Sequence, residues 1–302
     1  MNDRSQLIRA LTDRCPGLTP EEQVPLSGYT SFAIGGPAAV LVQPENAGEL
    51  AACLAVCAEA GQTPVILGSG TNVLAPDEGL DRVVIRTRGL EQVTVTGDGL
   101  IRADCGLSLA RLAKFAWDRG LAGLEFAQGI PGTVGGGVLM NAGAYGGEMA
   151  QVCTAVRFLG MDGSTRVFRG PDLGFGYRGS VFQSLDGVIV SAEFRLEPGD
   201  PREIKARMDD LAARRRASQP LELPSAGSTF KRPATGYAAA MIDQAGCKGL
   251  RVGGAAVSEK HAGFVVNLGG ATAGDVRELM AQVQRRVFDR FGVELEPEVR
   301  FL

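Results

Sequence analysis

The stretch Gly129–Glu148, GIPGTVGGGVLMNAGAYGGE, decides how the rest of the chain is interpreted, because it holds eight glycines in twenty residues. Without a Cβ, glycine lets the backbone adopt positive φ and lets another molecule approach the peptide plane closely. Flexible linkers are the alternative, but they mix glycine with serine and other polar residues. The residues between these glycines include Ile130, Val134, Val138 and Tyr145. The stretch therefore predicts a packed binding loop whose backbone N–H groups hold a phosphate or a flat ring.

The composition of the chain indicates more than one domain and no strong charge bias. Its 302 residues exceed the commonest size of a single domain, so two or three domains are expected. Lysine plus arginine number 31 against 34 for aspartate plus glutamate, and no basic tract carries interleaved aromatics, so no nucleic-acid partner is expected. The opening residues lack the apolar region of a signal peptide, and no apolar run could span a membrane. We therefore expect a cytoplasmic protein.

The cysteines and the single histidine give no sign of a metal site. Six cysteines form no CxxC pair, at positions 15, 53, 57, 105, 153 and 247, and His261 is the only histidine, so no bound metal is expected. Cys53 and Cys57 share an apolar helical stripe with Leu50 and Leu54, where cysteine behaves as a small hydrophobe. We interpret them as core residues without a redox role.

Hydrophobic periodicity predicts an α/β unit followed by mixed α and β structure. Strands are predicted at residues 40–42, 64–67, 82–85, 93–96, 100–103, 155–159, 165–168, 188–196, 254–257 and 263–267. Helices are predicted within 2–24, around 50–57, at 108–120 and 202–216, and around 276–287. Because Pro198, Gly199 and Pro201 interrupt regular structure, they mark a boundary. The chain is accordingly divided into four segments, which are residues 1–24 (an N-terminal arm), 25–88, 89–199 and 200–302.

A second glycine loop follows the strand predicted at 64–67, in the sequence LGSGTNVL from Leu67 to Leu74. It lacks the GxGxxG spacing and the acidic residue about twenty positions later that would support a Rossmann dinucleotide site. The loops Gly68–Val73 and Gly129–Gly136 could instead hold opposite sides of one extended anionic cofactor.

The sequence PSAGSTFKRP places Ser228 among small neighbours, with Lys231 and Arg232 close behind. It is not the G-x-S-x-G elbow of a nucleophilic serine, because Phe230 stands two residues after the serine. His261 is the one possible base for Ser-His catalysis, and no spacing supports that pair. Ser228 fits a proton donor better than a nucleophile, and a helix N-cap is the structural alternative.

Two charged residues stand in unusual settings. Arg178 lies in GYRGSVF, and its guanidinium suits a carboxylate, phosphate or enolate oxygen, although a surface ion pair is an equally good interpretation. Glu298 lies in the C-terminal sequence VELEPEVRFL, where three glutamates would ordinarily form a solvated edge. Burial of Glu298 beside a cation could instead tune its carboxylate for acid or base chemistry.

Six motifs together resemble the UDP-N-acetylenolpyruvoylglucosamine reductase family, over residues 27–302. They are GIPGTVGG with NAGAYGGE, LGSGTN, YRGSVF, QPLELPSAGSTFK, GGAAVSEKHAGFVVN and EPEVRF. The resemblance is closer to the shorter form of the family, which lacks an extra tyrosine-bearing loop. It implies a mixed α+β and α/β fold with a two-part FAD-binding domain of the vanillyl-alcohol-oxidase type at 25–88 and 89–199. A C-terminal α/β substrate domain would follow at 200–302.

The resemblance also implies an activity. Members of the family are FAD-containing, NADPH-dependent oxidoreductases that convert UDP-N-acetylglucosamine enolpyruvate to UDP-N-acetylmuramate for peptidoglycan, a step that supports cell wall biogenesis, cell shape and cell division during the cell cycle. FAD would be bound non-covalently, and NADPH would be a co-substrate. Hydride would reach C3 of the enolpyruvyl group from flavin N5, and Ser228 would protonate C2. Arg178 and Glu298 would stabilise the charge that develops between these steps.

Site residues follow from the resemblance position by position. The catalytic residues would be Arg178, Ser228 and Glu298. Substrate contacts would come from Tyr177, Lys231 and Arg232. The cofactor-binding residues would be Gly68, Ser69, Gly70, Thr71, Asn72, Val73, Gly129, Ile130, Pro131, Gly132, Thr133, Gly135, Gly136, Asn141, Ala142 and Gly143. Two departures concern substrate contacts, since the family commonly has FKNP and HANF where this chain has FKRP at 230–233 and HAGF at 261–264.

Two other functions are compatible with a flavin fold. One is an oxidase that uses O₂, a class whose members often tether flavin covalently through histidine or cysteine; the only histidine here, His261, lies in the expected substrate domain. The other is a flavin- or nucleotide-sugar-binding module without turnover. The presence of Arg178, Ser228 and Glu298 argues against that module.

Overall fold

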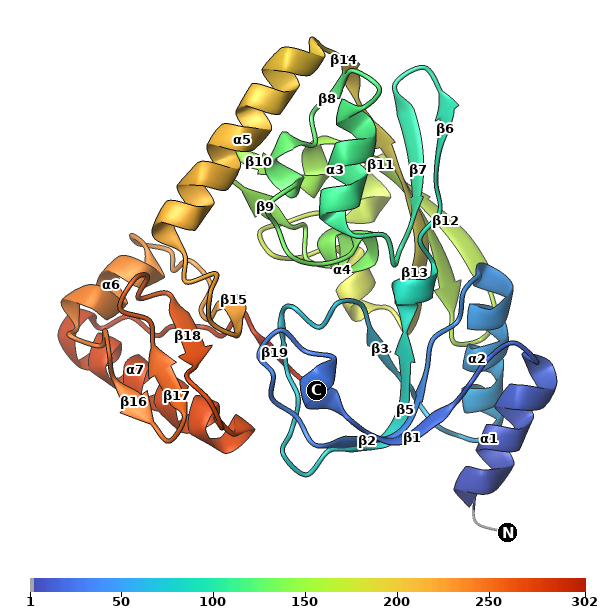
Figure 1. Cartoon of the computed structure of the whole chain (residues 1–302), viewed down its shortest axis with the longest axis horizontal. Coiled ribbons are helices and arrows are strands. Elements are labelled where there is room, and N and C mark those ends of the chain that lie inside the picture. Colours follow the sequence, from blue (N-terminus) through green and yellow to red (C-terminus); the bar gives the residue numbers. More distant parts are fainter. Residues whose placement is uncertain (1–2) are drawn as a thin grey trace. The chain divides into compact units, whose positions relative to one another are not determined.

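The computed structural model describes residues 3–302, which form two compact units (Figure 1). Of the described residues, the first unit comprises 3–22, 40–69 and 82–214, and the second comprises 23–39, 70–81 and 215–302. Residues 1 and 2, which the predicted N-terminal arm includes, lie outside the described residues. No helix among the described residues is both long and apolar enough to cross a membrane.

The first unit contains the strands and the helix that were predicted between residues 40 and 85. Helix α2 (Ala47–Glu59) begins at Asn46, whose side chain accepts a hydrogen bond from the backbone N–H of Glu49, and it packs against α1 (Asp3–Arg14). Strand β3 (Val65–Leu67) pairs in parallel with β5 (Leu80–Arg86). With β1 (Glu21–Pro25) and β2 (Pro37–Val42), these strands form a sheet of order β1-β2-β5-β3.

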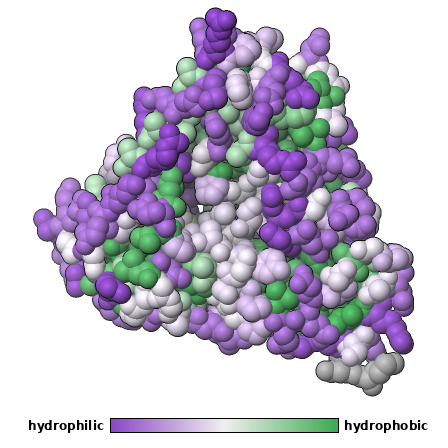
Figure 2. Space-filling view, in the orientation of Figure 1, coloured by the Kyte–Doolittle hydropathy of each residue, from purple (hydrophilic) through white to green (hydrophobic). Residues whose placement is uncertain are grey.

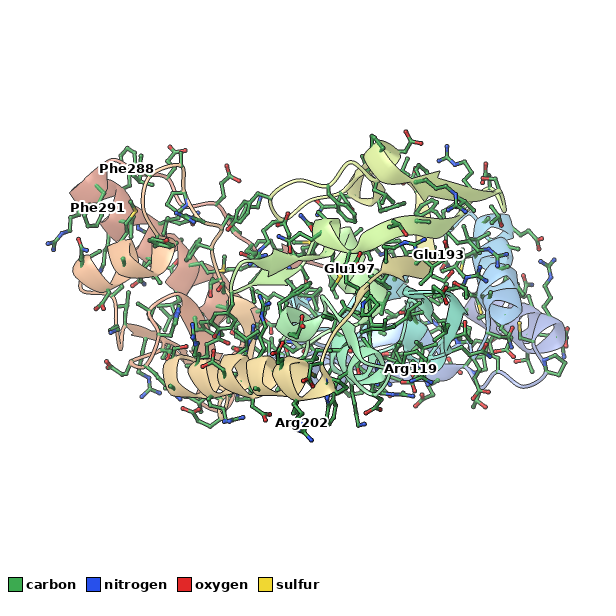
Figure 3. The ribbon with its side chains drawn as sticks, turned by 90° about the horizontal axis from the view of Figure 1, so that it is seen from above. Arg119, Glu193, Glu197, Arg202, Phe288 and Phe291 are labelled. Atoms are coloured by element: carbon green, nitrogen blue, oxygen red, sulfur yellow. The ribbon has the colours of Figure 1, made fainter. Side chains whose placement is uncertain are left out.

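An antiparallel sheet of order β12-β11-β13-β7-β6 forms the larger part of the first unit. Its strands are β6 (Val93–Gly97), β7 (Leu100–Asp104), β11 (Cys153–Gly160), β12 (Thr165–Arg169) and β13 (Gly187–Arg195), in agreement with the strands predicted in these ranges. Glu193 of β13 (Figure 3) pairs across the sheet with Arg102 at 3.0 Å and Arg169 at 3.7 Å. Alternation therefore places charged residues on one face and core residues on the other.

Helices α3 (Leu109–Trp117) and α4 (Val134–Leu139) belong to the same unit, and α4 contacts β13 and β7 (Figure 1). Ser108 caps α3, at the start of the helix predicted for 108–120, by accepting from the N–H of Arg111 at 3.2 Å. Two-residue strands are β4 (Val73–Leu74), β8 (Leu121–Ala122), β9 (Gly143–Ala144), β10 (Gly147–Glu148) and β14 (Glu197–Pro198). Short 3-10 helices occupy Leu26–Gly28, Thr87–Gly89, Glu125–Ala127, Met149–Gln151, Gly170–Leu173 and Val181–Ser184.

Helix α5 (Pro201–Ser218) begins at the predicted boundary. The indole N–H of Trp117 donates to the carbonyl of Pro201 at 2.9 Å, which anchors the start of the helix near Arg202 (Figure 3). The helix buries only Ile204 and Met208, and strongly hydrophilic residues lie along it in Figure 2. Most of the helix is therefore exposed to solvent.

The second unit is built on an antiparallel sheet of order β15-β18-β17-β16, formed by Ser225–Ser228, Phe264–Asn267, Ala255–Val257 and Arg251–Val252. Helices α6 (Ala238–Gln244) and α7 (Ala273–Phe291) pack together, and α7 lies against β16 and β17 (Figure 1). Helix α7, predicted around 276–287, buries a stripe made of Val276, Leu279, Met280, Val283 and Val287. Gly292, with φ of 65°, ends the helix one residue after Phe291 (Figure 3). Strand β19 (Arg300–Phe301) pairs in parallel with β4.

Candidate active site

The loop Gly129–Gly136 is packed onto the turn that precedes α3. The backbone N–H groups of Val134 and Gly135 donate to the carbonyls of Leu107 and Cys105, each at 2.8 Å. Thr133 is buried and caps α4 by accepting from the N–H of Gly136. The apolar residues between the glycines thus belong to a built loop, as expected. Four of its N–H groups, including that of Ile130, are used within the protein, so any ligand must be held by the others.

The loop Gly68–Val73 could not be formed with larger residues. A Cβ on Gly68 would lie 2.6 Å from Thr133 Oγ1, and a Cβ on Gly70, whose φ is 64°, would lie 2.1 Å from the carbonyl oxygen of Tyr29. Among residues 3–302, the backbone N–H groups of Ser69 and Gly70 donate to no protein acceptor, although Gly70 is buried. Buried N–H groups almost always have a partner. This loop therefore fits an anionic cofactor such as the diphosphate of FAD.

Both ends of the Asn141 side-chain amide form hydrogen bonds within the protein. It is buried with φ of 42°, its Nδ2 donates to the carbonyl of Gly176 at 3.0 Å, and its Oδ1 accepts from the N–H of Ala150 at 2.9 Å. Its side chain therefore braces the chain that leads to Arg178. A direct cofactor contact from the Asn141–Gly143 segment remains a prediction for its backbone.

Arg178 lies in a tight turn closed by two backbone hydrogen bonds between Gly176 and Gly179, at 3.0 and 3.2 Å. Its φ of 53° is uncommon for a residue with a side chain, and such strain is often found at functional sites. Gln183 Nε2 donates to the Arg178 carbonyl at 3.0 Å and to the Leu139 carbonyl at 3.1 Å. Sequence reasoning ended this motif at Phe182 and missed Gln183, because a single glutamine on a short helix carries no local signal.

The turn also fixes the surroundings of the arginine head group. Ser180 Oγ donates to the carbonyl of Leu139 at 2.8 Å, which ties the turn to the end of α4. Arg178 is half-buried, and its Nη1 lies 3.5 Å from the carbonyl oxygen of Gly143, beside the Asn141–Gly143 segment. The guanidinium is therefore held next to a segment predicted to bind the cofactor, in the first unit.

Ser228 ends strand β15, opposite Phe264, so the helix N-cap alternative is wrong. The residue is half-buried and follows Gly227, whose φ is 75°. The next residue, Thr229, is buried; its N–H donates to the carbonyl of Gly263, and its Oγ1 accepts from the N–H of Val265. These bonds fix the main chain at Ser228, while the serine hydroxyl makes no hydrogen bond within the described residues.

Glu298 lies beside the chain that follows Ser228. Its backbone N–H donates to the carbonyl of Thr229 at 2.8 Å, and its own carbonyl accepts from Asn72 Nδ2 at 3.1 Å. It is half-buried, whereas Glu294 and Glu296 are exposed. The solvated-edge interpretation therefore holds for those two glutamates but not for Glu298. The second unit thus brings together the segments of two predicted catalytic residues.

The two positive residues after Ser228 each contact a partner other than the serine in this structure. Lys231 Nζ pairs with Glu296 Oε2 at 3.1 Å, and the Lys231 backbone N–H donates to the Glu296 carbonyl. Arg232 lies over the ring of Tyr237 at 4.1 Å, and its Nε donates to the carbonyl of Gly236 at 3.3 Å. An exposed ion pair therefore occupies the ammonium group of Lys231, the cation that follows Ser228 most closely in the sequence.

His261 is a structural residue in the described chain. Its Nδ1 accepts from the N–H of Gly263 at 3.1 Å, and its ring lies edge-on to Phe264. Burial lowers the pKa of His261 below its usual value of 6.5, and the charge of Lys248 adds to the effect. The imidazole is therefore neutral at pH 7 and belongs to the packing of β18.

Comparisons with known proteins cover both halves of the chain. A family model described as the C-terminal domain of UDP-N-acetylenolpyruvoylglucosamine reductase matches residues 219–302, and one described as an FAD binding domain matches residues 38–169. The chain is 45% identical over 278 residues to UDP-N-acetylenolpyruvoylglucosamine reductase of Clostridium perfringens strain SM101, covering 92% of this chain and 91% of the relative. It is 42% identical over 295 residues to the reductase of Pediococcus pentosaceus, covering 97% and 98%.

A solved structure agrees with these relatives. The crystal structure of UDP-N-acetylenolpyruvylglucosamine reductase from Thermus caldophilus is similar with a TM-score of 0.80 and 37% identity, covering 94% of this chain and 99% of that chain. The predicted mixed α and β fold, with an FAD-binding domain followed by a C-terminal domain, is confirmed, and so is the FAD cofactor. The chain therefore belongs to the UDP-N-acetylenolpyruvoylglucosamine reductase family.

Proposed function

We propose that the protein catalyses the NADPH-dependent reduction of UDP-N-acetylglucosamine enolpyruvate to UDP-N-acetylmuramate in the cytoplasm, as a step of peptidoglycan precursor synthesis. The observation that carries this proposal is similarity to reductases over more than nine-tenths of both chains. Because the similarity spans the FAD-binding and C-terminal domains together, it supports the complete reaction rather than flavin binding alone.

In this proposal the glycine loops Gly68–Val73 and Gly129–Gly136, with Asn141–Gly143, hold FAD without a covalent bond. The N–H groups of Ser69 and Gly70 are suited to an anionic part of the cofactor. Residues 25–88 and 89–199 would form the two parts of the FAD domain, and residues 200–302 the substrate domain. When bound, FAD supplies C3 of the enolpyruvyl group with a hydride that originates from NADPH.

Arg178 and Glu298 would act where negative charge develops, at C2 and the neighbouring carboxylate of the substrate. The guanidinium of Arg178 offers a fixed fork of donors for these oxygens. Glu298 can stabilise an enolate only as a protonated carboxyl group that donates a hydrogen bond, because a carboxylate would repel it. Donors that are already in place when the charge appears lower the barrier without reorganisation.

Ser228 would donate its hydroxyl proton to C2. A general acid in this position contributes about 10²- to 10⁴-fold to the rate. Lys231 could assist only if its pair with Glu296 opens, since that pair holds the ammonium group at 3.1 Å from the Glu296 carboxylate. Tyr177, Lys231 and Arg232 are proposed to contact the sugar nucleotide, with Arg232 presenting a cation above the ring of Tyr237.

An anaerobic absorbance titration tests the proposal. We expect the purified holoenzyme to show a flavin spectrum that NADPH bleaches and that only the enolpyruvyl sugar nucleotide restores. Rapid recovery in air without that substrate would identify an oxidase. A spectrum that NADPH does not bleach would identify a binding module.

A further inference from the structure

The glycine loop that is suited to the cofactor is joined to Glu298 by the side chain of Asn72. We propose that Asn72 is a positioning residue for Glu298, so that the loop Gly68–Val73 also sets the place of the carboxyl group. The inference rests on the proposed function in one respect, because it treats Glu298 as a catalytic group. It assigns the Asn72 side chain to the protein rather than to the cofactor.

Two hydrogen bonds carry the link from the side of the loop. Asn72 Nδ2 donates to the carbonyl of Glu298 at 3.1 Å, and the carbonyl of Asn72 accepts from the N–H of Arg300 at 3.0 Å. A carbonyl can only accept, so the NH₂ end of the amide must face Glu298. The two bonds grip the main chain on both sides of Val299, which is buried. The C-terminal segment therefore cannot shift along the loop without breaking both.

The opposite side of Glu298 is held by the chain that follows Ser228. The N–H of Glu298 donates to the carbonyl of Thr229 at 2.8 Å, and the adjacent Pro297 forms a β-bridge with Phe230. Both polar groups of the Glu298 backbone are thus used, one toward the serine segment and one toward the glycine loop. The main chain of Glu298 is fixed, and its half-buried side chain extends from a rigid base.

A fixed main chain at Glu298 matters because proton transfer and charge stabilisation depend on small changes in the distance between reacting groups. Displacement of a reacting group by about 1 Å can cost about 10²-fold in rate. Loss of the bond from Asn72 Nδ2 would leave the N–H of Glu298 bonded to Thr229 but would loosen the side of its main chain that faces the glycine loop. We therefore expect a slower substrate half-reaction with little change in flavin binding.

The first test is the isosteric variant Asn72→Asp, which removes the NH₂ donor and places an oxygen against the Glu298 carbonyl. We expect the holoenzyme to keep its FAD and to be bleached by NADPH within about twofold of the wild-type rate. Reoxidation by the enolpyruvyl sugar nucleotide should slow about tenfold. The backbone amide of Arg300 should exchange faster with deuterium, which reports the loosened link independently of activity.

A second variant removes the other hydrogen bond of this link without a substitution in the glycine loop. Arg300→Pro removes the N–H that donates to the Asn72 carbonyl, and its effect on reoxidation should not add to that of Asn72→Asp in the double variant. The matched control is Asn267→Asp, since Asn267 Nδ2 also donates to a backbone carbonyl of the second unit, that of Phe32, at 3.0 Å. This control should lower the melting temperature but leave the ratio of the two half-reactions unchanged.

Each result decides the proposal. Loss of FAD from Asn72→Asp would assign the side chain to the cofactor and overturn it, as would two half-reactions at wild-type rates. Additive effects of Asn72→Asp and Arg300→Pro would show that the two bonds do not act as one link. If the wild-type flavin is not reoxidised by the sugar nucleotide at all, the proposed function fails instead.

Discussion

Ser228 can be replaced with little structural cost, because its hydroxyl makes no hydrogen bond within residues 3–302. We expect Ser228→Ala to retain FAD and its bleaching by NADPH, while reoxidation by the enolpyruvyl substrate slows by about 10²- to 10⁴-fold. Stopped-flow absorbance separates the two half-reactions. Ser225→Ala, in the same strand, is the control and should behave as wild type. Substrate turnover near the wild-type rate in Ser228→Ala would show that Ser228 is not the general acid.

His261 gives the protein a pH-dependent stability that can be isolated, since it is the only histidine. Burial lowers its pKa in the folded state, so between the ordinary value of 6.5 and the folded pKa the unfolded chain binds more protons. The stabilising contribution of the neutral ring is therefore complete above pH 6.5 and is lost as the pH falls toward the folded pKa. Urea denaturation at pH 7.5 and 5.5 should show a smaller pH effect in His261→Gln. Equal pH effects in both proteins would contradict this account.

Residue identities were predictable where a motif fixes them, but residue partners were not. Arg178, Ser228 and Glu298 could be named because each stands in a short distinctive sequence. The pair between Lys231 and Glu296 joins residues 65 positions apart, and no local pattern indicates it. The pair engages the cation nearest to Ser228 in the sequence, so charge close to a residue in the sequence is a poor guide to the charge available to it in space.

Helix α7 begins on a carboxylate that comes from a distant loop. Asp77 Oδ1 accepts from the N–H of Ala273 at 2.7 Å and Oδ2 from that of Gly274 at 3.0 Å. We expect Asp77→Ala to lower the free energy of unfolding by about 1–2 kcal/mol, because two N–H groups and the helix dipole lose their acceptor. Urea denaturation measures the change. The exposed neighbour variant Glu78→Ala is the control, and an equal loss in that protein would show that the cap contributes nothing.

The larger elements followed from periodicity, whereas the shortest ones did not. The buried stripe of α7 and the strands of the five-stranded sheet match the expected positions, because each has several turns or residues on one face. Strand β19 has two residues, and its partner β4 lies in the glycine loop region, more than two hundred positions earlier. Pairing at that separation is decided by tertiary packing, and it is this pairing that places Glu298.

The compact units are interleaved along the chain. Segments 23–39 and 70–81 belong to the second unit although most of the first 214 residues belong to the first. No shift in composition marks either segment in the sequence. The domains proposed from the motifs are therefore continuous stretches of sequence, whereas each compact unit is made of separate stretches. The loop Gly68–Val73, which is proposed to bind the cofactor, contains one of these crossings, since residue 69 belongs to the first unit and residue 70 to the second.

The six cysteines report on the cores of both units, because all are free and buried and only Cys247 lies in the second. Burial raises the pKa of Cys53, Cys105 and Cys153 to about 12 and that of Cys57 to about 11, and it raises the pKa of Cys15 and Cys247 as well. At pH 8 a thiol of pKa 12 is ionised to only about 10⁻⁴, and thiolate is the reactive form.

We therefore expect no cysteine of the native holoenzyme to react promptly with a thiol-specific disulfide reagent at pH 8, whereas all six react once urea unfolds the chain and their pKa returns to about 8.5. Absorbance of the released thiol gives the number of reacted cysteines, and mass spectrometry assigns them. The same measurement bears on the oxidase alternative, since a cysteine that carries flavin would not react even in urea. Prompt labelling of Cys247 alone would show that the second unit, which contains the main-chain bonds that hold Glu298, opens independently of the first.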